Sequence, residues 1–455
     1  MRLMILLFVA VVLLPVQVGA ATITVGPSDC SSSTVNSAIT TAGNGDTVNL
    51  TCTGSATWSS TVTIPNTKGI TLQVQGGTYT PPPGTWPLLI TCATGANPCL
   101  QVNIANGRSV TRVTGFHFTD NFAPSNGAVF VQGQGLGPSG VGSFRVDNNF
   151  FDTFQVGDNA DLQGTVTVWT ANGSTNALTG VIDHNHFLDA SYLDSYVIQI
   201  NDQSEVGGSG IPYRGGRAWA NALGWGTSDF IFIEDNLIEQ QAHYARHLIA
   251  AIQGAKYVSR YNTFTSNIAN SGVQAELNEA HGYCFCTNIG HGTRGGEIYQ
   301  NTYGGTQAGI FMNLRGGTWA VHDNTFTSTP GGTYIFLREY RAGSSAMYNQ
   351  CTATCPSDNT WFNGATDASH YPMHEQIGYN HLNQVEPSYF WNNLRSGVNQ
   401  VPTVDSAGVQ QQYIQVNRDY YTSEAPGYMP YTYPHPLTRI TDNTPPSAPQ
   451  NLRIQ

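Results

Sequence analysis

Charged residues are scarce in this sequence. Only 10% of the 455 residues are charged, and lysine occurs only at Lys68 and Lys256; about a quarter charged is usual in soluble proteins. The formal net charge is −11, which argues against a nucleic acid partner because phosphate binding needs a basic surface. A local cluster of arginines can still bind an anionic polymer.

Long hydrophobic runs are also missing after the N-terminus. The opening "MRLMILLFVAVVLLPVQVGA" has a basic start at Arg2, an apolar run and a small-residue exit. This pattern is typical of a secretory signal peptide, here residues 1–20, and the run is short for a membrane span. We therefore expect an exported, extracellular protein without a membrane span.

Cysteine is limited to eight residues, which suits an oxidising compartment. Proximity in the sequence favours three disulfides, namely Cys30–Cys52, Cys92–Cys99 and Cys351–Cys355. The remaining pair in "YCFC", Cys284 and Cys286, has His281 and His291 nearby. A further disulfide arrangement and a metal site are both open for this pair.

A short motif recurs along the chain. A strand-like segment ends in an asparagine, and an apolar or aromatic residue follows two positions later, as in "VIDHNHF" and "AVHDNTF". The intervals between copies are 36, 51, 26, 39 and 23 residues, and the repeated asparagines are Asn149, Asn185, Asn236, Asn262, Asn301 and Asn324. A constant motif at variable spacing predicts a parallel β-helix, an all-β solenoid whose loops differ in length. A β-sandwich with recurrent asparagine turns is the alternative.

In such a solenoid the asparagines would stack into a hydrogen-bonded ladder at the corners, with the aromatic residues packed inside. The segment 34–41 predicts a short amphipathic helix that covers the open N-terminal end, within a cap and first coil at 21–75. Residues 76–440 would form the β-helix. Its Tyr- and Pro-rich segment 420–437 is expected to lie across the last coils, and 441–455 is typical of a linker to further modules.

Together, the signal peptide, helix cap, "GITLQ" first coil and repeated "NxF" corners resemble the pectate-lyase-like superfamily of right-handed, single-stranded parallel β-helices. The resemblance covers nearly all of the mature chain. It implies a carbohydrate-active protein, but the superfamily includes lyases, hydrolases, epimerases and non-catalytic adhesins.

Positions two before each asparagine should face outward, because the residues three before are mostly apolar and side chains alternate. They read Asp147, Asp183, Glu234, Arg260, Tyr299 and His322. Resemblance to pectate lyases implies that Asp183 and Glu234, with Asp147, bind Ca²⁺, and that Lys256 and Arg260 act on the substrate. A solvated sheet face with salt bridges is the alternative.

A second group of polar residues follows in the next coils. Glu276, Glu279 and His281 lie in "ELNEAHGY", and Arg294 follows in "HGTRGGE". Arg315 and Arg338 each fall fourteen residues after a repeated asparagine, so we expect them to stack on adjacent coils. Stacked arginines repel unless they meet an anion, which suggests a carboxylate-bearing ligand, although salt bridges to Glu297 or Glu339 would also satisfy them.

These residues lead us to expect a monomeric polysaccharide lyase that cleaves a uronate-containing polymer by β-elimination. Lys256, Arg260 and His281 are the candidate catalytic residues, and Ca²⁺ is a candidate cofactor. The candidate substrate-binding residues are Glu279, Arg294, Arg315, Arg338 and His322.

Two alternatives remain open. A glycoside hydrolase would need two carboxylates, for example Asp183 with Asp189, Asp194 or Asp202. A non-catalytic binding protein could use Trp219 and Trp225 to stack on sugar rings, although these residues could simply cover the edge of a coil.

Overall fold

The structure is a computed structural model that describes residues 19–79, 84–121, 126–133, 142–154, 164–172, 178–189, 196–203, 216–241, 247–267, 276–282, 291–305, 310–327, 333–338, 375–380, 384–405 and 414–439. Several predictions fall outside these ranges: residues 1–18 of the signal peptide, the linker 441–455, Asp194, and the cysteines 284, 286, 351 and 355. Within the described ranges, no helix is long and apolar enough to cross a membrane.

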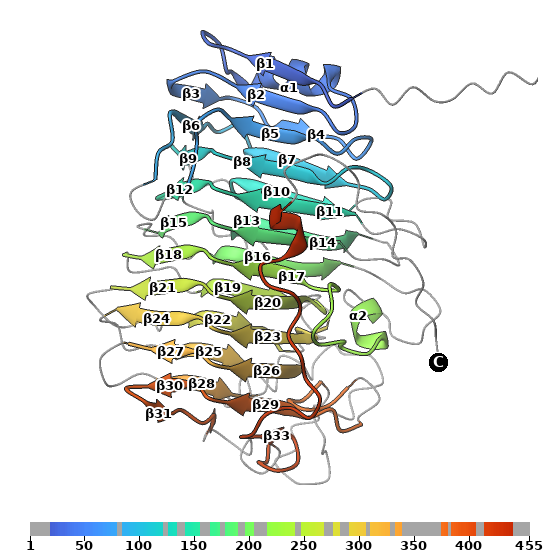
Figure 1. Ribbon diagram of the computed structural model, residues 1–455, viewed down its shortest axis with the longest axis vertical. Helices are drawn as coiled ribbons and strands as arrows, with labels where there is room; N and C mark the ends of the chain where they lie inside the picture. The colour runs from blue at the N-terminus through green and yellow to red at the C-terminus, as the bar shows by residue number, and fades with distance from the viewer. Residues whose placement is uncertain are drawn as a thin grey trace, which may run out of the picture.

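The chain forms a right-handed parallel β-helix with three sheets, which confirms the predicted fold class (Figure 1). Sheet A contains β1 (Thr22–Val25), β2 (Thr47–Leu50), β5 (Thr71–Val74), β8 (Thr111–Thr114), β11 (Ser143–Asp147), β14 (Thr179–Asp183), β17 (Ile231–Glu234), β20 (Lys256–Arg260), β23 (Gly295–Tyr299), β26 (Thr318–His322), β29 (Ser388–Trp391) and β33 (Tyr420–Tyr421).

The chain passes from sheet A to sheet B and then to sheet C in each coil. Sheet B contains β3 (Gly54–Trp58), β6 (Leu88–Cys92), β9 (His117–Asp120), β12 (Phe150–Asp152), β15 (His186–Asp189), β18 (Leu237–Gln240), β21 (Thr263–Ser266), β24 (Thr302–Gly305), β27 (Thr325–Phe326), β30 (Leu394–Arg395) and β31 (Val398–Asn399). Sheet C contains β4 (Val62–Ile64), β7 (Leu100–Ile104), β10 (Val129–Gly133), β13 (Gly164–Asn172), β16 (Tyr196–Gln203), β19 (His247–Ile252), β22 (Glu276–Ala280), β25 (Ile310–Leu314), β28 (Thr333–Leu337) and β32 (Thr403–Val404).

The repeated asparagines form a continuous ladder at the corner between sheets A and B. The side-chain amide of Asn236 donates to Asn262 Oδ1 at 3.0 Å, and Asn262 donates to Asn301 Oδ1 at the same distance. The residue before each ladder asparagine has a positive φ, for example +56° at Asp235 and +55° at Tyr261, and this left-handed residue turns the chain. The ladder also continues to Asn393, which the sequence motif did not identify.

Direct bonding along the ladder shows that the variable intervals hold insertions rather than extra coils. Asn185 and Asn236 are 51 residues apart, yet the backbone N–H of Asn185 donates to Asn236 Oδ1 at 3.0 Å. Correspondingly, β14 pairs with β17 in register. The residue two positions after a ladder asparagine points into the core, where aromatic rings stack. Phe151, for example, stacks on Phe187 with ring centroids 4.7 Å apart.

Replacing one ladder residue is expected to be costly. Asn262→Ala removes the acceptor for Asn236 and the donor to the Ile233 carbonyl, both buried. Each orphaned buried group costs about 1–3 kcal/mol, so we expect the free energy of unfolding to fall by about 2 kcal/mol or more. Urea unfolding measures this loss, with the exposed Asn221→Ala as control; equal losses in the two variants would contradict the ladder's role.

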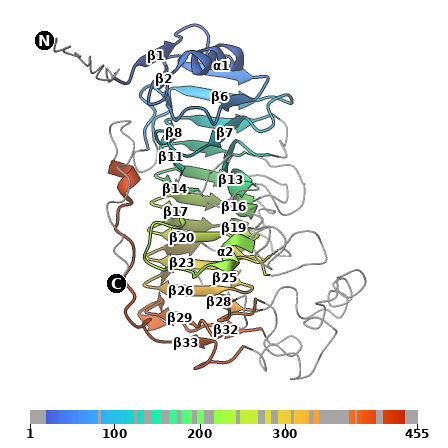
Figure 2. The ribbon, with the colours of Figure 1, turned by 90° about the vertical axis from the view of Figure 1, so that its right-hand side faces the viewer.

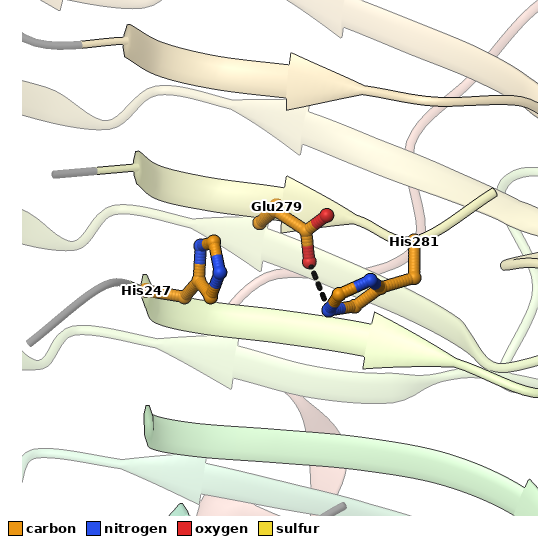
Figure 3. A group of neighbouring side chains, drawn as sticks. All are labelled: His247, Glu279 and His281. Atoms are coloured by element: carbon orange, nitrogen blue, oxygen red, sulfur yellow. Dashed lines mark ion pairs between the residues drawn. The ribbon is translucent and has the colours of Figure 1, made fainter. Parts of the chain in front are cut away.

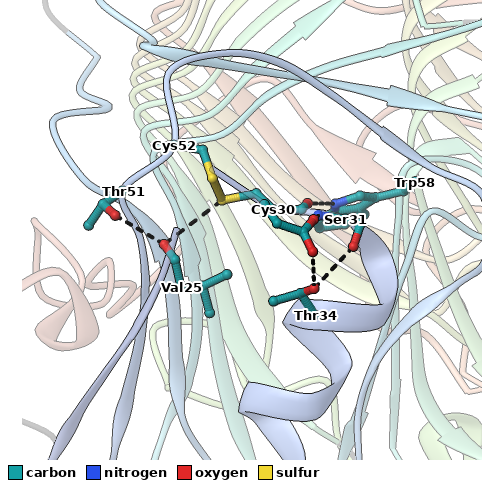
Figure 4. Close-up of a disulfide and its surroundings, with 8 residues drawn as sticks. Val25, Cys30, Ser31, Thr34, Thr51, Cys52 and Trp58 are labelled. Carbon is teal, nitrogen blue, oxygen red and sulfur yellow. Dashed lines mark hydrogen bonds between the residues drawn. A yellow bond between two sulfur atoms is a disulfide. The ribbon is translucent and has the colours of Figure 1, made fainter. Parts of the chain in front are cut away.

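The N-terminal end is closed as predicted. Helix α1 (Ser32–Thr41) begins two residues earlier than expected and covers the first coils (Figure 1). The Cys30–Cys52 disulfide ties the chain entering α1 to the strand layer below it, and Trp58 Nε1 donates to the Cys30 carbonyl at 3.0 Å (Figure 4). Cys92–Cys99 is the second confirmed disulfide.

The C-terminal segment covers one face of the solenoid. From β33 it runs back along the outside of sheet A and ends in a short 3-10 helix, Pro436–Arg439, near β14 (Figures 1 and 2). The sequence predicted that this segment would lie across the last coils only. In the structure it extends much further, to the middle of the solenoid. We call residues 420–439 the C-terminal strap.

Candidate active site

The predicted outward column lies on sheet A but is not exposed. Asp147, Asp183 and Glu234 are paired in register with one another and then with Arg260, as the sequence indicated. All four are buried, each with a relative exposure of 0%. The expectation of an exposed column is therefore wrong. The C-terminal strap lies against Glu234 and Arg260, and arginine side chains pair with Asp147 and Asp183.

Each carboxylate of this column is paired with an arginine. The donor–acceptor distances range from 2.5 to 2.9 Å for the pairs Arg112–Asp147, Arg145–Asp183 and Arg260–Glu234. A cation between them would have to displace a guanidinium, so these contacts favour the salt-bridge alternative over a Ca²⁺ site.

The strap completes the hydrogen bonding of these buried charges. Arg260 donates to the carbonyls of Tyr431 and Thr432 at 2.8 and 3.0 Å, and the His435 N–H donates to Glu234 Oε1 at 2.8 Å. Burial raises the pKa of Glu234 above its usual value even though Arg260 opposes the shift. The column therefore anchors the strap.

Three further predicted site residues are also engaged in packing around sheet A. Lys256 pairs with Asp229 and lies 4.8 Å from the centre of the Phe230 ring. Arg294 Nη1 lies 2.7 Å from Glu386 Oε2. His322 stacks between Tyr299 and Trp391, with ring centroids 4.8 and 4.2 Å away. His281, the remaining candidate catalytic residue, takes part in none of these contacts.

The remaining predicted residues meet on the outward face of sheet C. Ala280, Leu314 and Leu337 are paired across β22, β25 and β28, so the residues that follow them lie on neighbouring coils. These residues are His281, Arg315 and Arg338, which form one column at a spacing of about 4.8 Å per coil. The predicted stacking of Arg315 and Arg338 is confirmed.

Two glutamates hold this column together. Arg315 reaches both, with Nη2 3.0 Å from Glu276 Oε2 and Nε 3.0 Å from Glu279 Oε1. His281 Nε2 lies 2.9 Å from the other oxygen of Glu279. Arg338 is the most open member, with 24% of its side chain exposed, and lies 3.8 Å from Glu276.

His247 and Tyr196 extend the cluster onto the two coils before it. They are register partners of Glu276, because Tyr196 pairs with His247 and His247 with Glu276. The Tyr196 ring stacks on His247 at 5.0 Å and meets His281 edge-on at 6.4 Å. We call the seven residues the sheet C cluster: Tyr196, His247, Glu276, Glu279, His281, Arg315 and Arg338.

Local charges tune the acidic groups of the cluster. Burial alone would raise the pKa of Glu279, but Arg315 and His281 outweigh it and hold the pKa below its usual value. Glu276 is likewise lowered, because Arg315 and His247 outweigh its burial. Burial and the neighbouring Arg315 lower the pKa of Arg338. Both glutamates are therefore anionic and both arginines cationic at neutral pH.

Part of the cluster could hold a metal ion. One ligand atom from each of His247, Glu279 and His281 lies within 4.8 Å of the others, and Figure 3 shows the three side chains converging from neighbouring strands. Two imidazoles and one carboxylate suit Zn²⁺ or a similar transition metal. Ca²⁺ takes six to eight oxygen ligands, so this donor set does not fit the expected calcium ion.

Of the two salt-bridge partners expected for the arginines, Glu297 is wrong and Glu339 stays untested. Glu297 lies on sheet A, where it accepts hydrogen bonds from Gly226 and Tyr428, and Glu339 is outside the described residues. Two of the carboxylate pairs expected for a hydrolase are not assembled, because Asp183 lies on sheet A, Asp189 on sheet B and Asp202 on sheet C. The third, with Asp194, stays untested.

Fold and cluster together define a parallel β-helix with a buried Glu–His–Arg constellation on one sheet.

No protein-family model and no curated protein matches the sequence. An alginate lyase from Paenibacillus sp. str. FPU-7 is similar in structure over 70% of this chain and 97% of its own, with 15% sequence identity and a TM-score of 0.36. A mutant of the PL6 family alginate lyase AlyGC is similar over 86% of this chain and 56% of its own, with 12% identity and a TM-score of 0.31. Likeness at this level carries no argument about the reaction, which must come from the side chains.

Proposed function

We propose that this protein is a polysaccharide lyase that cleaves a uronate-containing polymer by β-elimination at the sheet C cluster. The observation that carries the proposal is the column His281–Arg315–Arg338, which places an imidazole and two guanidinium groups on three successive coils. A base next to two carboxylate-binding cations is what elimination beside a carboxylate requires.

Binding of the sugar carboxylate is the first step. Arg338 is the most solvent-accessible cation of the column, and Arg315 lies beside it with its charge already shared by Glu276 and Glu279. A uronate carboxylate over Arg338 would relieve the repulsion between the two arginines and form charge-assisted hydrogen bonds. Neutralising that carboxylate makes the adjacent C5 proton more acidic.

Proton transfer follows from the position of His281. Glu279 Oε2 lies 2.9 Å from its Nε2 and orients the ring, and we assign Nδ1 as the atom that accepts the C5 proton. The C5–H electron pair forms the C4–C5 double bond, and the C4–O bond breaks with its electrons passing to the leaving oxygen. Tyr196, edge-on to His281, is our candidate to protonate that oxygen.

Hydrolysis is less consistent with this cluster. A glycoside hydrolase needs one carboxyl group whose raised pKa keeps it protonated. The pKa values of Glu276 and Glu279 are both lowered. A carboxyl group with a lowered pKa is a poor general acid, whereas both glutamates can position the cationic and imidazole groups that elimination uses.

The carboxylate-binding role predicts a selective loss in Arg338→Ala. We expect kcat/KM on a polyuronate to fall by about 10- to 100-fold, because one charge-assisted contact to the substrate is lost. The fold should be unaffected, since the side chain is partly exposed. Arg395→Ala on sheet B is the matched control, and equal activity in both variants would remove Arg338 from the site.

Metal removal gives a separate prediction. Because the cluster's donor set does not fit Ca²⁺ and Arg315 already supplies positive charge at Glu279, we expect activity to be unchanged after dialysis against EDTA. Loss of activity that Ca²⁺ restores would contradict this and return calcium to the mechanism. Loss that Zn²⁺ restores would instead assign the metal to His247, Glu279 and His281.

Export completes the proposal, because such polymers lie outside the cell. It is motivated by the signal-peptide pattern of residues 1–20. N-terminal sequencing of protein recovered from the culture medium tests it, and a start near residue 21 is the expected result.

A further inference from the structure

A concave surface lies beside sheet A, on a different sheet from the sheet C cluster. It is a cleft of about 580 Å³ between the loop after α2 (Gly216–Ala220), the chain leading into β29 and the C-terminal strap. Its lining includes Trp225, Glu386, Tyr389, Pro426, Tyr428 and Met429. Its volume is in the range of small-ligand sites.

Three aromatic rings form the walls of this cleft. The Trp225 ring centroid is 6.2 Å from those of both Tyr389 and Tyr428, at interplanar angles of 80° and 89°. Each edge-on pair covers one ring face at most, and Tyr389 also stacks on Tyr421 with centroids 5.4 Å apart, so a ligand would use the remaining faces of these rings. Met429 at the rim is 78% exposed, so the strap adds apolar surface here.

Buried contacts fix the walls in place. Trp225 Nε1 donates to the Gly296 carbonyl at 3.2 Å, and the Tyr428 hydroxyl donates to the buried Glu297 carboxylate. Glu297 also accepts the Gly226 N–H at 2.9 Å. Because the rings are held before any ligand arrives, little conformational entropy is lost on binding.

The charge of the cleft distinguishes among ligands. Its charged lining residue is Glu386, whose oxygens lie 2.9 and 2.7 Å from Arg294. Arg294 itself is buried, at 1% exposure, and among the described lining residues there is no lysine or arginine. A polyanion would meet no accessible cation here, whereas sugar hydroxyls can donate to the Glu386 carboxylate.

We infer that this cleft binds one or two units of a neutral polysaccharide, with sugar ring faces against Trp225 and the tyrosines and hydroxyl groups at Glu386. The aromatic faces supply rigid apolar area, and the carboxylate supplies orientation. Of the two tryptophans in the 217–230 segment, Trp219 is fully buried and donates to the Gly292 carbonyl at 2.9 Å, so it covers the coil. Trp225 is the ligand-facing member. This inference does not depend on the proposed lyase activity.

Titration with neutral hexasaccharides tests the inference. Cello-, xylo-, manno- and galactohexaose are added to the full-length protein while tryptophan fluorescence and calorimetric heat are recorded. We expect saturable binding of at least one of them, and a loss of affinity of about tenfold or more in Trp225→Ala and in Tyr389→Ala. The matched control is Tyr433→Ala, a 40%-exposed ring on the same strap outside the cleft.

Thermal unfolding of each variant shows whether the strap stays docked, and Trp225→Phe, which keeps an apolar ring, should retain part of the affinity. Absence of binding to all four sugars at low-millimolar concentration would overturn the inference. So would binding that Trp225→Ala leaves unchanged, or displacement of the bound sugar by a polyuronate. Cleavage assays on the sheet C cluster are unaffected by any of these outcomes.

Discussion

Replacement of His281 by alanine is expected to lower kcat on a polyuronate by about 100- to 10,000-fold, the usual contribution of a general base. The substrate would still bind, because Arg315 and Arg338 stay on their coils, so KM should change much less than kcat. Initial rates over a range of polymer concentrations separate the two quantities. Imidazole added to the His281→Ala variant should restore part of the rate, a readout that a merely structural role would not move.

Two other variants make this test selective. His117→Ala removes a partly exposed imidazole on sheet B that pairs with Asp152, so activity should be retained. Lys256→Ala removes another candidate catalytic residue, which pairs with Asp229 beside sheet A. Full activity in a folded His281→Ala variant, together with loss in Lys256→Ala, would reverse the assignment.

Replacement of Arg260 by alanine is expected to lower the free energy of unfolding by about 3–5 kcal/mol. Arg260 and Glu234 both have fully buried side chains, with Nη2 and Oε2 2.6 Å apart, and removing one partner leaves a buried charge without its counter-ion. The same change also removes two hydrogen bonds to the strap. Equilibrium unfolding in urea measures the loss.

A double variant distinguishes the buried charge from other causes. Arg260→Met with Glu234→Leu removes both charges and keeps much of the volume, so its stability should lie well above that of Arg260→Ala. Remaining activity per folded molecule should be near that of the native protein in both variants. If Arg260→Ala abolished activity without loss of stability, Arg260 would be catalytic, as the resemblance first implied.

The fold could be predicted from the sequence because one local requirement repeats in every coil. The corner between sheets A and B needs a buried asparagine after a residue with left-handed backbone conformation. This requirement produces a motif that can be recognised in the amino-acid sequence. The same motif fixed the register of sheet A, which is why Asp183, Glu234 and Arg260 were aligned correctly. Their burial was not visible, because the strap that covers them is about 170 to 200 residues away in sequence, as the Arg260–Tyr431 and Glu234–His435 contacts show.

The sheet C cluster was harder to predict because the chain reaches it through connections of different length. Arg315 and Arg338 both follow a ladder asparagine by fourteen residues, and their stacking could be predicted. His281 follows Asn262 by nineteen, so the same offset did not place it beside them. His247 had no local motif at all, and only strand pairing in β19 and β22 brings it to Glu276.

The most direct test of the proposed function is the ultraviolet absorbance of the conjugated C4–C5 double bond during incubation with pectic, alginate and glycosaminoglycan polymers. We expect absorbance to rise with at least one of these polymers for the native protein, and hardly to rise for His281→Ala. New reducing ends without the absorbance rise would show hydrolysis instead and contradict β-elimination at the sheet C cluster.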